Sequence, residues 1–287
     1  MFIGLTGSHG MVGQNFIEAA KGKHEIIPIP RLHEDDTPWG RVPDIIIHAG
    51  GLVGGIKANI ANPFDFLYHN ARCGLEVIKA AKEFGIPRLI NLGSSCMYSP
   101  QSSQPFREED LFKGEPEPTN EGYAIAKRAV ARLAGYAGYK TLVPCNLYGR
   151  HDHFRDGGHL IADVIYRAIV AKRYNYPLAV WKPDVRREFM YAGDFAQCLL
   201  RAVENYDSLP DIMNVGCEQD YSIDEYYETI IDVVGFQGRL LAQYDAPRGM
   251  VSKKVDITKM KQWGWMPQTD IVEGIRKTVE WYIRDTQ

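Results

Sequence analysis

The chain has 287 residues, of which 45% are hydrophobic and 24% are charged, and its formal net charge is −3. This is the composition of an ordinary globular protein with enough apolar residues for a sizeable core. The small net charge excludes the broad positive field that attracts nucleic acid, so any anionic ligand must be held by local residues. We therefore expect no nucleic-acid partner. No apolar run approaches the roughly 20 residues that a membrane span needs, so we expect no membrane partner either.

The first residues and the cysteines bear on the compartment. The chain begins "MFIGLTGSHG", which is typical of a strand and a glycine turn and lacks the basic and apolar regions of a signal peptide. An odd number of cysteines without paired spacing favours reduced thiols over a disulfide framework. The five are Cys73, Cys96, Cys145, Cys198 and Cys217. We therefore expect a cytoplasmic protein.

Apolar, β-rich runs alternate with helix-length segments through the first half. The runs are "MFIGLTG" (1–7), "HEIIPIP" (24–30), "DIIIHAG" (44–50), "RLINLGSS" (88–95) and "KTLVPCNLYG" (140–149). Residues 63–85 carry apolar side chains at spacings of three and four, and this predicted helix ends at Gly85, with Pro87 beyond. Near-continuous apolar strands separated by helices indicate a parallel sheet covered on both faces. The predicted fold class is α/β, a Rossmann-type doubly wound parallel sheet.

The second half predicts a smaller, mixed α/β lobe. Helical patterns cover residues 159–174, 222–235 and 270–286, and Ser222 with Glu225 three residues later forms a capping box. Short β-rich pieces lie between them. We predict a nucleotide-binding domain over residues 1–150 and a substrate-binding lobe over 151–287, with the chain returning to the first domain near 187–216.

A glycine-rich turn follows the first strand. "TGSHGMVGQNF" places Gly7, Gly10 and Gly13 in a strand–turn–helix context. The early glycines let the backbone approach a pyrophosphate, and the last lets the helix pack on the sheet with its N-terminus toward the phosphates. His9, inside the turn, is a further phosphate contact. The pattern predicts a dinucleotide cofactor.

The end of the second strand distinguishes the two nicotinamide cofactors. An acidic residue there would accept the ribose hydroxyl of NAD, whereas arginine suits the 2′-phosphate of NADP. Here "HEIIPIPR" ends on Arg31, and no carboxylate follows until Glu34. We therefore favour NADP(H), with NAD and a merely solvated Arg31 as the alternatives.

Tyr123 and Lys127 in "EPTNEGYAIAK" form a candidate reductive pair. Their i, i+4 spacing puts both on one face of a helix. A tyrosine with its usual pKa of ~10 is a poor acid–base group at neutral pH. We expect the neighbouring cation, together with the nicotinamide charge, to lower the pKa of Tyr123. Ser94, which ends the fourth strand, is placed to hydrogen-bond the same substrate oxygen.

With the glycine turn in the same order, these residues resemble those of the extended short-chain dehydrogenases/reductases. Longer stretches are similar to the GDP-L-fucose synthase family, whose members are 3,5-epimerase-4-reductases of GDP-4-keto-6-deoxy-D-mannose. The similar stretches are "GLVGGIK", "LGSSCMY", "EPTNEGYAIAK", "NLYGRHDHF" and "REFMYAGD". The resemblance implies a GDP-sugar substrate and a homodimer that pairs the helices around residues 64–84 and 123–127.

The resemblance also implies roles for Cys96 and His159. A C4 ketone acidifies the protons on C3 and C5, so Cys96 acts as base and His159 as acid on the opposite face, while Tyr123 and Ser94 stabilise the enolate. The alternatives are that Cys96 is inert packing and that His159 is merely a polar residue at a helix start. "HDH" at 151–153 suggests a metal, but no third clustered ligand is evident, so we expect none.

The remaining site residues follow from the same matches. The expected cofactor-binding residues are Gly7, His9, Gly10, Met11, Val12, Gly13, Arg31, Asn70, Tyr123, Lys127, Asn146 and Leu147. The expected substrate-binding residues are Lys57, Arg167, Arg187 and Lys253, the last with an uncertain register because Lys254 is adjacent. Arginine suits phosphate and ribose oxygens, although any single basic residue is more often a solvated surface charge.

Three departures from the family pattern leave the exact sugar nucleotide open. "VWKPDVRREF" lacks the usual Gly-x-Gly, the segment after Arg31 is short, and "YDAPRGMVSKK" differs from the family's proline-aspartate-glycine segment. Our first hypothesis is an epimerase-reductase that makes GDP-L-fucose. The second is a related 4-reductase for a GDP-4-keto-heptose or a colitose precursor. The third, a silent NADP(H)-binding scaffold, is disfavoured because Ser94, Tyr123 and Lys127 are all present.

Overall fold

A six-stranded, all-parallel sheet forms the centre of the computed structural model, which describes residues 1–30, 41–155, 157–244 and 249–286. In spatial order its strands are β10 (Ile212–Val215), β5 (Lys140–Pro144), β4 (Leu89–Leu92), β3 (Ile45–His48), β1 (Phe2–Thr6) and β2 (Glu25–Ile29). All five strand pairings are parallel. The predicted fold class is confirmed, and all five sequence runs of the first half supply strands of this sheet.

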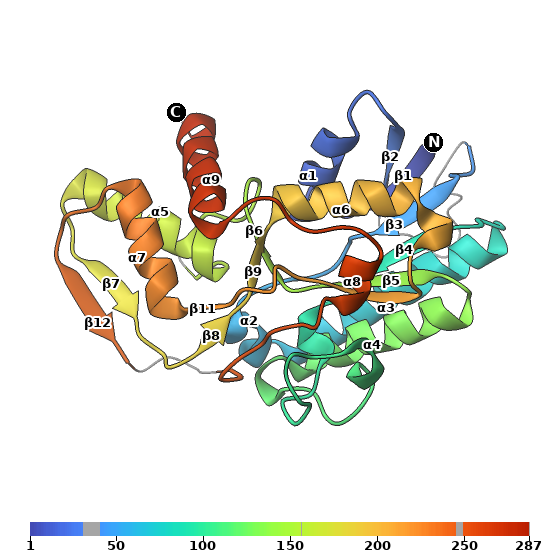
Figure 1. Ribbon diagram of the computed structural model, residues 1–287, viewed down its shortest axis with the longest axis horizontal. Helices are drawn as coiled ribbons and strands as arrows, with labels where there is room; N and C mark the ends of the chain where they lie inside the picture. The colour runs from blue at the N-terminus through green and yellow to red at the C-terminus, as the bar shows by residue number, and fades with distance from the viewer. Residues whose placement is uncertain (31–40, 156, 245–248, 287) are drawn as a thin grey trace.

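Helices cover both faces of the sheet (Figure 1). On one face α1 (Met11–Ala20) packs against α6 (Ala192–Glu204), and on the other α3 (Pro63–Glu83) packs against α4 (Glu121–Tyr136). The inner strands are buried along their whole length because side chains on both of their sides contact helices. Gly85 follows α3 with a φ of +64°, which is the helix end that the sequence predicts.

A second lobe has its own apolar core. Its helices are α5 (Leu160–Tyr174), α7 (Ile223–Val234) and α9 (Ile271–Asp285). Its strands form two pairs, β7 (Leu178–Trp181) with β12 (Leu240–Gln243), and β8 (Arg186–Arg187) with β11 (Tyr221–Ser222). The predicted capping box is present: Ser222 Oγ accepts the Glu225 N–H at 3.2 Å, and the Glu225 carboxylate accepts the Ser222 N–H at 2.6 Å.

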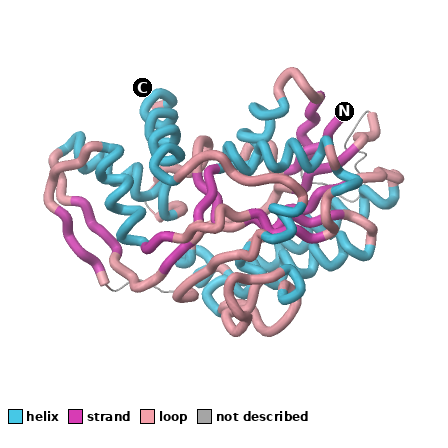
Figure 2. Tube along the Cα trace, viewed as in Figure 1, coloured by secondary structure: helices cyan, strands magenta, loops and turns pink. Residues whose placement is uncertain are grey.

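The chain passes between the lobes several times, as Figure 2 shows in its central strands and loops. β6 (Asn146–Tyr148) leaves the main sheet and pairs in parallel with β9 (Phe189–Tyr191), and α6 then returns to pack on α1. Two short helices, α2 (Ile56–Ala61) and α8 (Thr258–Gln262), lie in the connecting segments. Within the described ranges, no helix combines the length and apolar character that a bilayer crossing needs.

Glu188, just before β9, forms hydrogen bonds with several of the segments that cross between the lobes. Its side chain has 0% exposure. The carboxylate accepts the backbone N–H groups of Cys217, Glu218 and Val255 at 2.8–3.0 Å. Its backbone oxygen accepts both the backbone N–H and the side-chain amide of Asn146. One buried residue therefore joins four separate chain segments between the lobes.

We predict that Gly74→Ala lowers the free energy of unfolding by about 1–3 kcal/mol, through overpacking between α3 and α4. The added carbon would lie 2.4 Å from Val130 Cγ2. Denaturant unfolding followed by circular dichroism measures the effect. Gly135→Ala in α4 is the matched control, because its added carbon meets no atom within 4 Å. Equal destabilisation by the two substitutions would contradict a close α3–α4 contact.

Candidate active site

The glycine turn lies at the carboxyl end of β1, where two of its glycines are closely surrounded by backbone. Gly7 has a φ of +68°, and a Cβ there would lie 2.7 Å from the Ala49 oxygen. A Cβ at Gly13 would lie 2.3 Å from the Gly7 oxygen, so neither position accepts a side chain. Gly10 begins α1 without a side-chain cap, and the first turn has no acidic residue. The free N–H groups of this turn therefore suit an anion.

The other predicted residues of the turn have simple surroundings. His9 is exposed, with Nδ1 at 3.2 Å from Ser8 Oγ, and Met11 and Val12 are half-buried in the first turn of α1. Arg31, on which the preference for NADP(H) depends, lies outside the described residues.

Tyr123 and Lys127 share one face of α4, as their spacing predicts. Lys127 is 6% exposed; its Nζ donates to the Leu92 oxygen at 2.9 Å and lies 5.8 Å from the centre of the Tyr123 ring. Burial lowers the pKa of Lys127 to about 8. The ammonium is thus fixed between β4 and the tyrosine ring.

The pKa of Tyr123 shifts opposite to our expectation. Burial, followed by the negative charge of Cys96, raises it above the usual value, and a hydrogen bond with Ser94 offsets only part of the rise. Lys127 is bonded to the backbone of β4, and its charge does not counter the burial. Tyr123 therefore remains a protonated phenol, which is the form that donates a proton.

Ser94 and Cys96 follow β4 in a tight turn. Ser94 begins a 3₁₀ turn, Ser95–Met97, and its Oγ accepts the Cys96 N–H at 3.2 Å. The Cys96 sulfur accepts a hydrogen bond at 3.1 Å from Lys253 Nζ, whose residue is only 7% exposed. This contact joins the end of β4 to a segment more than 150 residues away.

The surroundings of Cys96 favour its thiolate. Burial alone would raise the pKa of the thiol, but the charge of Lys253, hydrogen bonds with Ser94 and Lys253, and the charge of Arg187 outweigh it. The net pKa therefore lies below the usual value for cysteine. Cys96 is half-buried, and a lowered pKa is the property by which reactive cysteines differ from inert ones.

The structure fixes the register that the sequence left uncertain. Lys253 is the lysine at the site, whereas the Lys254 backbone N–H donates to Gln104 Oε1 at 3.1 Å. The sequence predicted Lys253 as a contact of the substrate diphosphate. Its ammonium instead hydrogen-bonds the Cys96 sulfur.

The other predicted cations differ in their availability. Burial lowers the pKa of Arg187 in β8. The negative charges of Cys96 and Glu117 act in the opposite direction and offset part of this effect. Arg167 donates to Asp163, the Ala179 oxygen and the Tyr227 hydroxyl, so its guanidinium is already bonded within the second lobe. Lys57 is exposed on α2.

His159 begins α5 and is paired with Asp152. Its Nδ1 lies 3.0 Å from Asp152 Oδ1, and the aspartate is almost fully buried. The hydrogen bond with Asp152 raises the pKa of His159, and burial offsets part of the rise. His151 contacts Glu18 and the Trp281 ring instead of Asp152.

The loop at residues 50–56 connects these groups. Asn70 holds it, because its amide donates to the Leu52 oxygen and accepts the Leu52 N–H. A Cβ on Gly51 would lie 3.8 Å from Lys127 Nζ, and one on Gly55 would lie 3.4 Å from the oxygen of Gly158, next to His159. Asn70, predicted as a cofactor contact, therefore positions the loop. Asn146 and Leu147 lie in β6, at the lobe junction.

Sequence reasoning missed the partners of the predicted residues. Asp152 was considered only as a metal ligand, and nothing in the sequence linked Glu117 to Arg187 or Glu188 to the lobe junction. The only sequence signal for the pairing was that Asp152 lies a few residues before His159, which begins a helix. A separate cavity of about 570 Å³, lined by residues such as Arg150 and Trp281, lies between α6 and α9 and contains none of the predicted catalytic residues.

Residues 3–216 match the model of the NAD dependent epimerase/dehydratase family. Over 99% of both chains, the sequence is 38% identical to a GDP-L-colitose synthase from Yersinia pseudotuberculosis. It is also 38% identical to a GDP-L-fucose synthase from Azorhizobium caulinodans, over 97% of this chain and 95% of that one. A GDP-L-fucose synthetase from Naegleria fowleri bound to NADP superposes with a TM-score of 0.88 at 23% identity, over 99% of this chain and 93% of that one, a likeness that shows the fold.

Lys253→Gln should shift the alkylation of Cys96 to higher pH, because the variant loses the ammonium that stabilises the thiolate. The rate of iodoacetamide labelling at Cys96, read by peptide mass spectrometry across pH, measures this shift. Lys254→Gln is the matched control and should leave the profile unchanged. Coincident profiles for wild type and Lys253→Gln would show that the 3.1 Å contact does not set the ionisation of Cys96.

Proposed function

This chain belongs to the NAD dependent epimerase/dehydratase family, and its sequence is similar over nearly its whole length to GDP-L-colitose and GDP-L-fucose synthases. On this basis we propose the following reaction. The enzyme inverts ring carbons of a GDP-4-keto-6-deoxy-hexose and then reduces the C4 ketone with NADPH. The proposed substrate is GDP-4-keto-6-deoxy-D-mannose and the product GDP-L-fucose. The contact between Lys253 and Cys96, beside Ser94 and Tyr123, carries the proposal.

The first lobe fits a dinucleotide. The crowded glycines at positions 7 and 13 and the uncapped start of α1 form an anion site, with the fixed ammonium of Lys127 further along the same sheet edge. We propose that residues 1–150, with returning segments near 187–216, bind the cofactor, and that residues 151–287 bind the sugar nucleotide. NADPH, when bound, supplies the hydride that reduces the C4 ketone.

Cys96 and His159 invert the ring carbons. The C4 ketone acidifies the protons on C3 and C5, so the Cys96 thiolate removes a proton and leaves an enolate. Ser94 and Tyr123 donate hydrogen bonds to the enolate oxygen. His159, whose pKa is raised by its hydrogen bond with Asp152, returns a proton to the opposite face of the same carbon. The carbon thereby changes configuration without net gain or loss of atoms.

Tyr123 completes the reduction. Its phenol is protonated, and it hydrogen-bonds with Ser94. When C4 becomes an alkoxide, Tyr123 gives its proton to that oxygen, and the Lys127 ammonium lies 5.8 Å from the centre of the tyrosine ring. The buried surroundings that raise the pKa of the free phenol thus keep the proton in place until the oxygen charge develops.

We propose Arg187 as the main cation for the substrate diphosphate. Arg187 lies close enough to Cys96 for their charges to interact, and its planar guanidinium suits phosphate oxygens. Lys57, which is exposed on α2, is a further candidate for the diphosphate. Arg167 is a weaker candidate because Asp163 and Tyr227 already occupy its nitrogens.

A colitose-type GDP-4-keto sugar is the second candidate substrate. The specific observation in its favour is the 38% identity to a GDP-L-colitose synthase over 99% of both chains. Steady-state turnover of both substrates, with the products identified by chromatography and mass spectrometry, decides between them. A higher kcat/KM for GDP-4-keto-6-deoxy-D-mannose supports the first proposal, and a higher value for the other sugar overturns it.

Tyr123→Phe should lower the rate of NADPH oxidation by about 10²–10⁴-fold, the usual contribution of a positioned general acid. The dissociation constant of NADPH, measured by fluorescence titration, should change little because only one hydroxyl is lost. Tyr174→Phe, at an exposed position in the second lobe and outside α3 and α4, is the control and should retain full turnover. Unchanged turnover in Tyr123→Phe would refute the reductive role.

We also propose that the protein is a homodimer formed through α3 and α4. These helices expose large apolar side chains, with Phe64 71% and Tyr136 81% exposed. Tyr68, Leu75 and Ile125 are exposed on the same two helices, and the rings of Phe64 and Tyr68 stack at 5.7 Å. Such an apolar face on a helix pair is typical of an interface.

Tyr68→Glu should convert the dimer to a monomer, because it buries a charge in the apolar contact. Size-exclusion chromatography with light scattering gives the mass directly. Tyr174→Glu, at an exposed tyrosine in the second lobe, is the control and should remain dimeric. A monomeric wild-type protein would contradict the proposed interface.

A further inference from the structure

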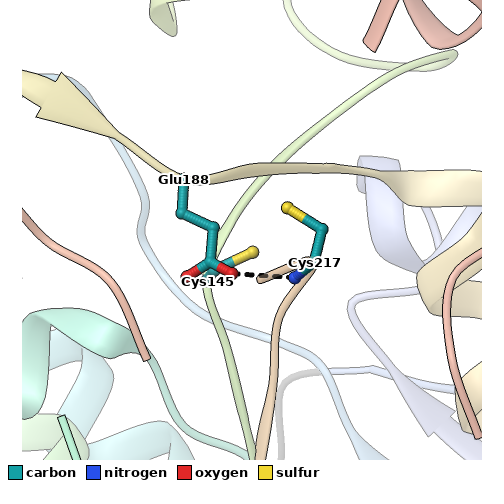
Figure 3. Close-up of side chains that lie close together, drawn as sticks. All are labelled: Cys145, Glu188 and Cys217. Carbon is teal, nitrogen blue, oxygen red and sulfur yellow. Dashed lines mark hydrogen bonds between the residues drawn. The ribbon is translucent and has the colours of Figure 1, made fainter. Parts of the chain in front are cut away.

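Two cysteines that the proposed reaction does not use meet at the lobe junction. Cys145 links β5 to β6, and Cys217 follows β10, the strand beside β5. The Cys145 N–H donates to the Val215 oxygen at 2.9 Å, so the two cysteines leave neighbouring strands almost side by side. Figure 3 shows both side chains beside Glu188, whose carboxylate accepts the Cys217 N–H.

The sulfur atoms are close to each other and to a carboxylate oxygen. The two Sγ atoms and one oxygen of Glu188 all lie within 4.8 Å of one another. Neither sulfur makes a short hydrogen bond, since their carbonyl acceptors lie at 3.3–3.5 Å. Formation of a bond between the two sulfurs would therefore break no short hydrogen bond that either sulfur makes.

These three groups suit a disulfide better than a metal ion. The Glu188 oxygens already accept the N–H groups of Cys217, Glu218 and Val255. A metal ion at this carboxylate would compete with three buried N–H donors for its oxygens. Formation of a disulfide leaves all three hydrogen bonds in place.

We propose that Cys145 and Cys217 form a reversible disulfide when the protein meets a peroxide. The pair is a modification site distinct from Cys96, and it joins two of the points where the chain passes between the lobes. Cys217 is half-buried and Cys145 is buried, so peroxide reaches Cys217 first.

The chemistry balances with one peroxide molecule. Hydrogen peroxide transfers an oxygen to the Cys217 sulfur, which breaks the O–O bond, releases water and leaves a sulfenic acid. The Cys145 sulfur then attacks, the S–S bond forms, the S–O bond breaks and a second water leaves. The proton of the Cys145 thiol, whose pKa burial raises, leaves with the hydroxyl of the sulfenic acid as that second water. Two thiols are oxidised and the peroxide is reduced.

The disulfide would make the junction more rigid. It closes the chain between residues 145 and 217 and links β5 directly to the segment that enters β11. Such a cross-link restricts the unfolded chain and stabilises the native one. Thiol reductants reverse the bond and release the junction.

The test is to treat the full-length protein with hydrogen peroxide, block remaining thiols under denaturing conditions, and digest it without reductant. We expect a peptide pair joining Cys145 to Cys217 with the mass of two hydrogens lost. The oxidised protein should also show a higher thermal unfolding midpoint, and dithiothreitol should reverse both changes.

Cys217→Ala should abolish the joined peptide and the thermal shift, whereas Cys198→Ala, which removes another buried thiol, should retain both. Oxidation of Cys96 in the same digest shows that the peroxide was effective. If Cys96 is oxidised and no joined peptide forms, the proposal is overturned. It is equally overturned if the thermal shift persists in Cys217→Ala.

Discussion

The buried carboxylate of Glu188 is the constraint on which the site depends. It is fully enclosed, and it accepts three backbone N–H groups from two segments that reach it from different parts of the chain. One donor, Val255, is two residues from Lys253, and Glu188 itself follows Arg187. By fixing the backbone at these points, Glu188 brings both cations to Cys96. Burial raises the pKa of Glu188, and these hydrogen bonds offset part of that rise.

Local interactions then shift the pKa of each proposed reacting group toward the protonation state that its proposed role requires. Lys253, Ser94 and Arg187 lower the pKa of Cys96 and so favour the thiolate, the form that its proposed role as a base requires. Asp152 raises the pKa of His159, so an imidazolium acid persists to higher pH. Burial keeps Tyr123 a phenol. The proposed base and the two proposed acids can coexist because the pKa of each is set by different neighbouring groups.

The sequence predicted what local pattern encodes and missed what long-range contacts decide. The strands, the glycine turn and the Tyr123–Lys127 face follow from periodicity and spacing, and all are present. The role of Lys253 depends on a contact across more than 150 residues, which no spacing rule reveals. The direction of the Tyr123 shift was wrong because burial, a tertiary property, outweighs the nearby cation. The pairing of Asp152 with His159 depends on how their loop folds.

The central claim is that the Cys96 thiolate removes protons from the sugar ring. Proton NMR of GDP-4-keto-6-deoxy-D-mannose with the enzyme in heavy water, before NADPH is added, tests it most directly. The account predicts that deuterium enters at C3 and C5 with the wild-type enzyme and not with Cys96→Ser. Reduction by NADPH without any ring deuterium, or equal deuterium entry in the variant, would contradict it.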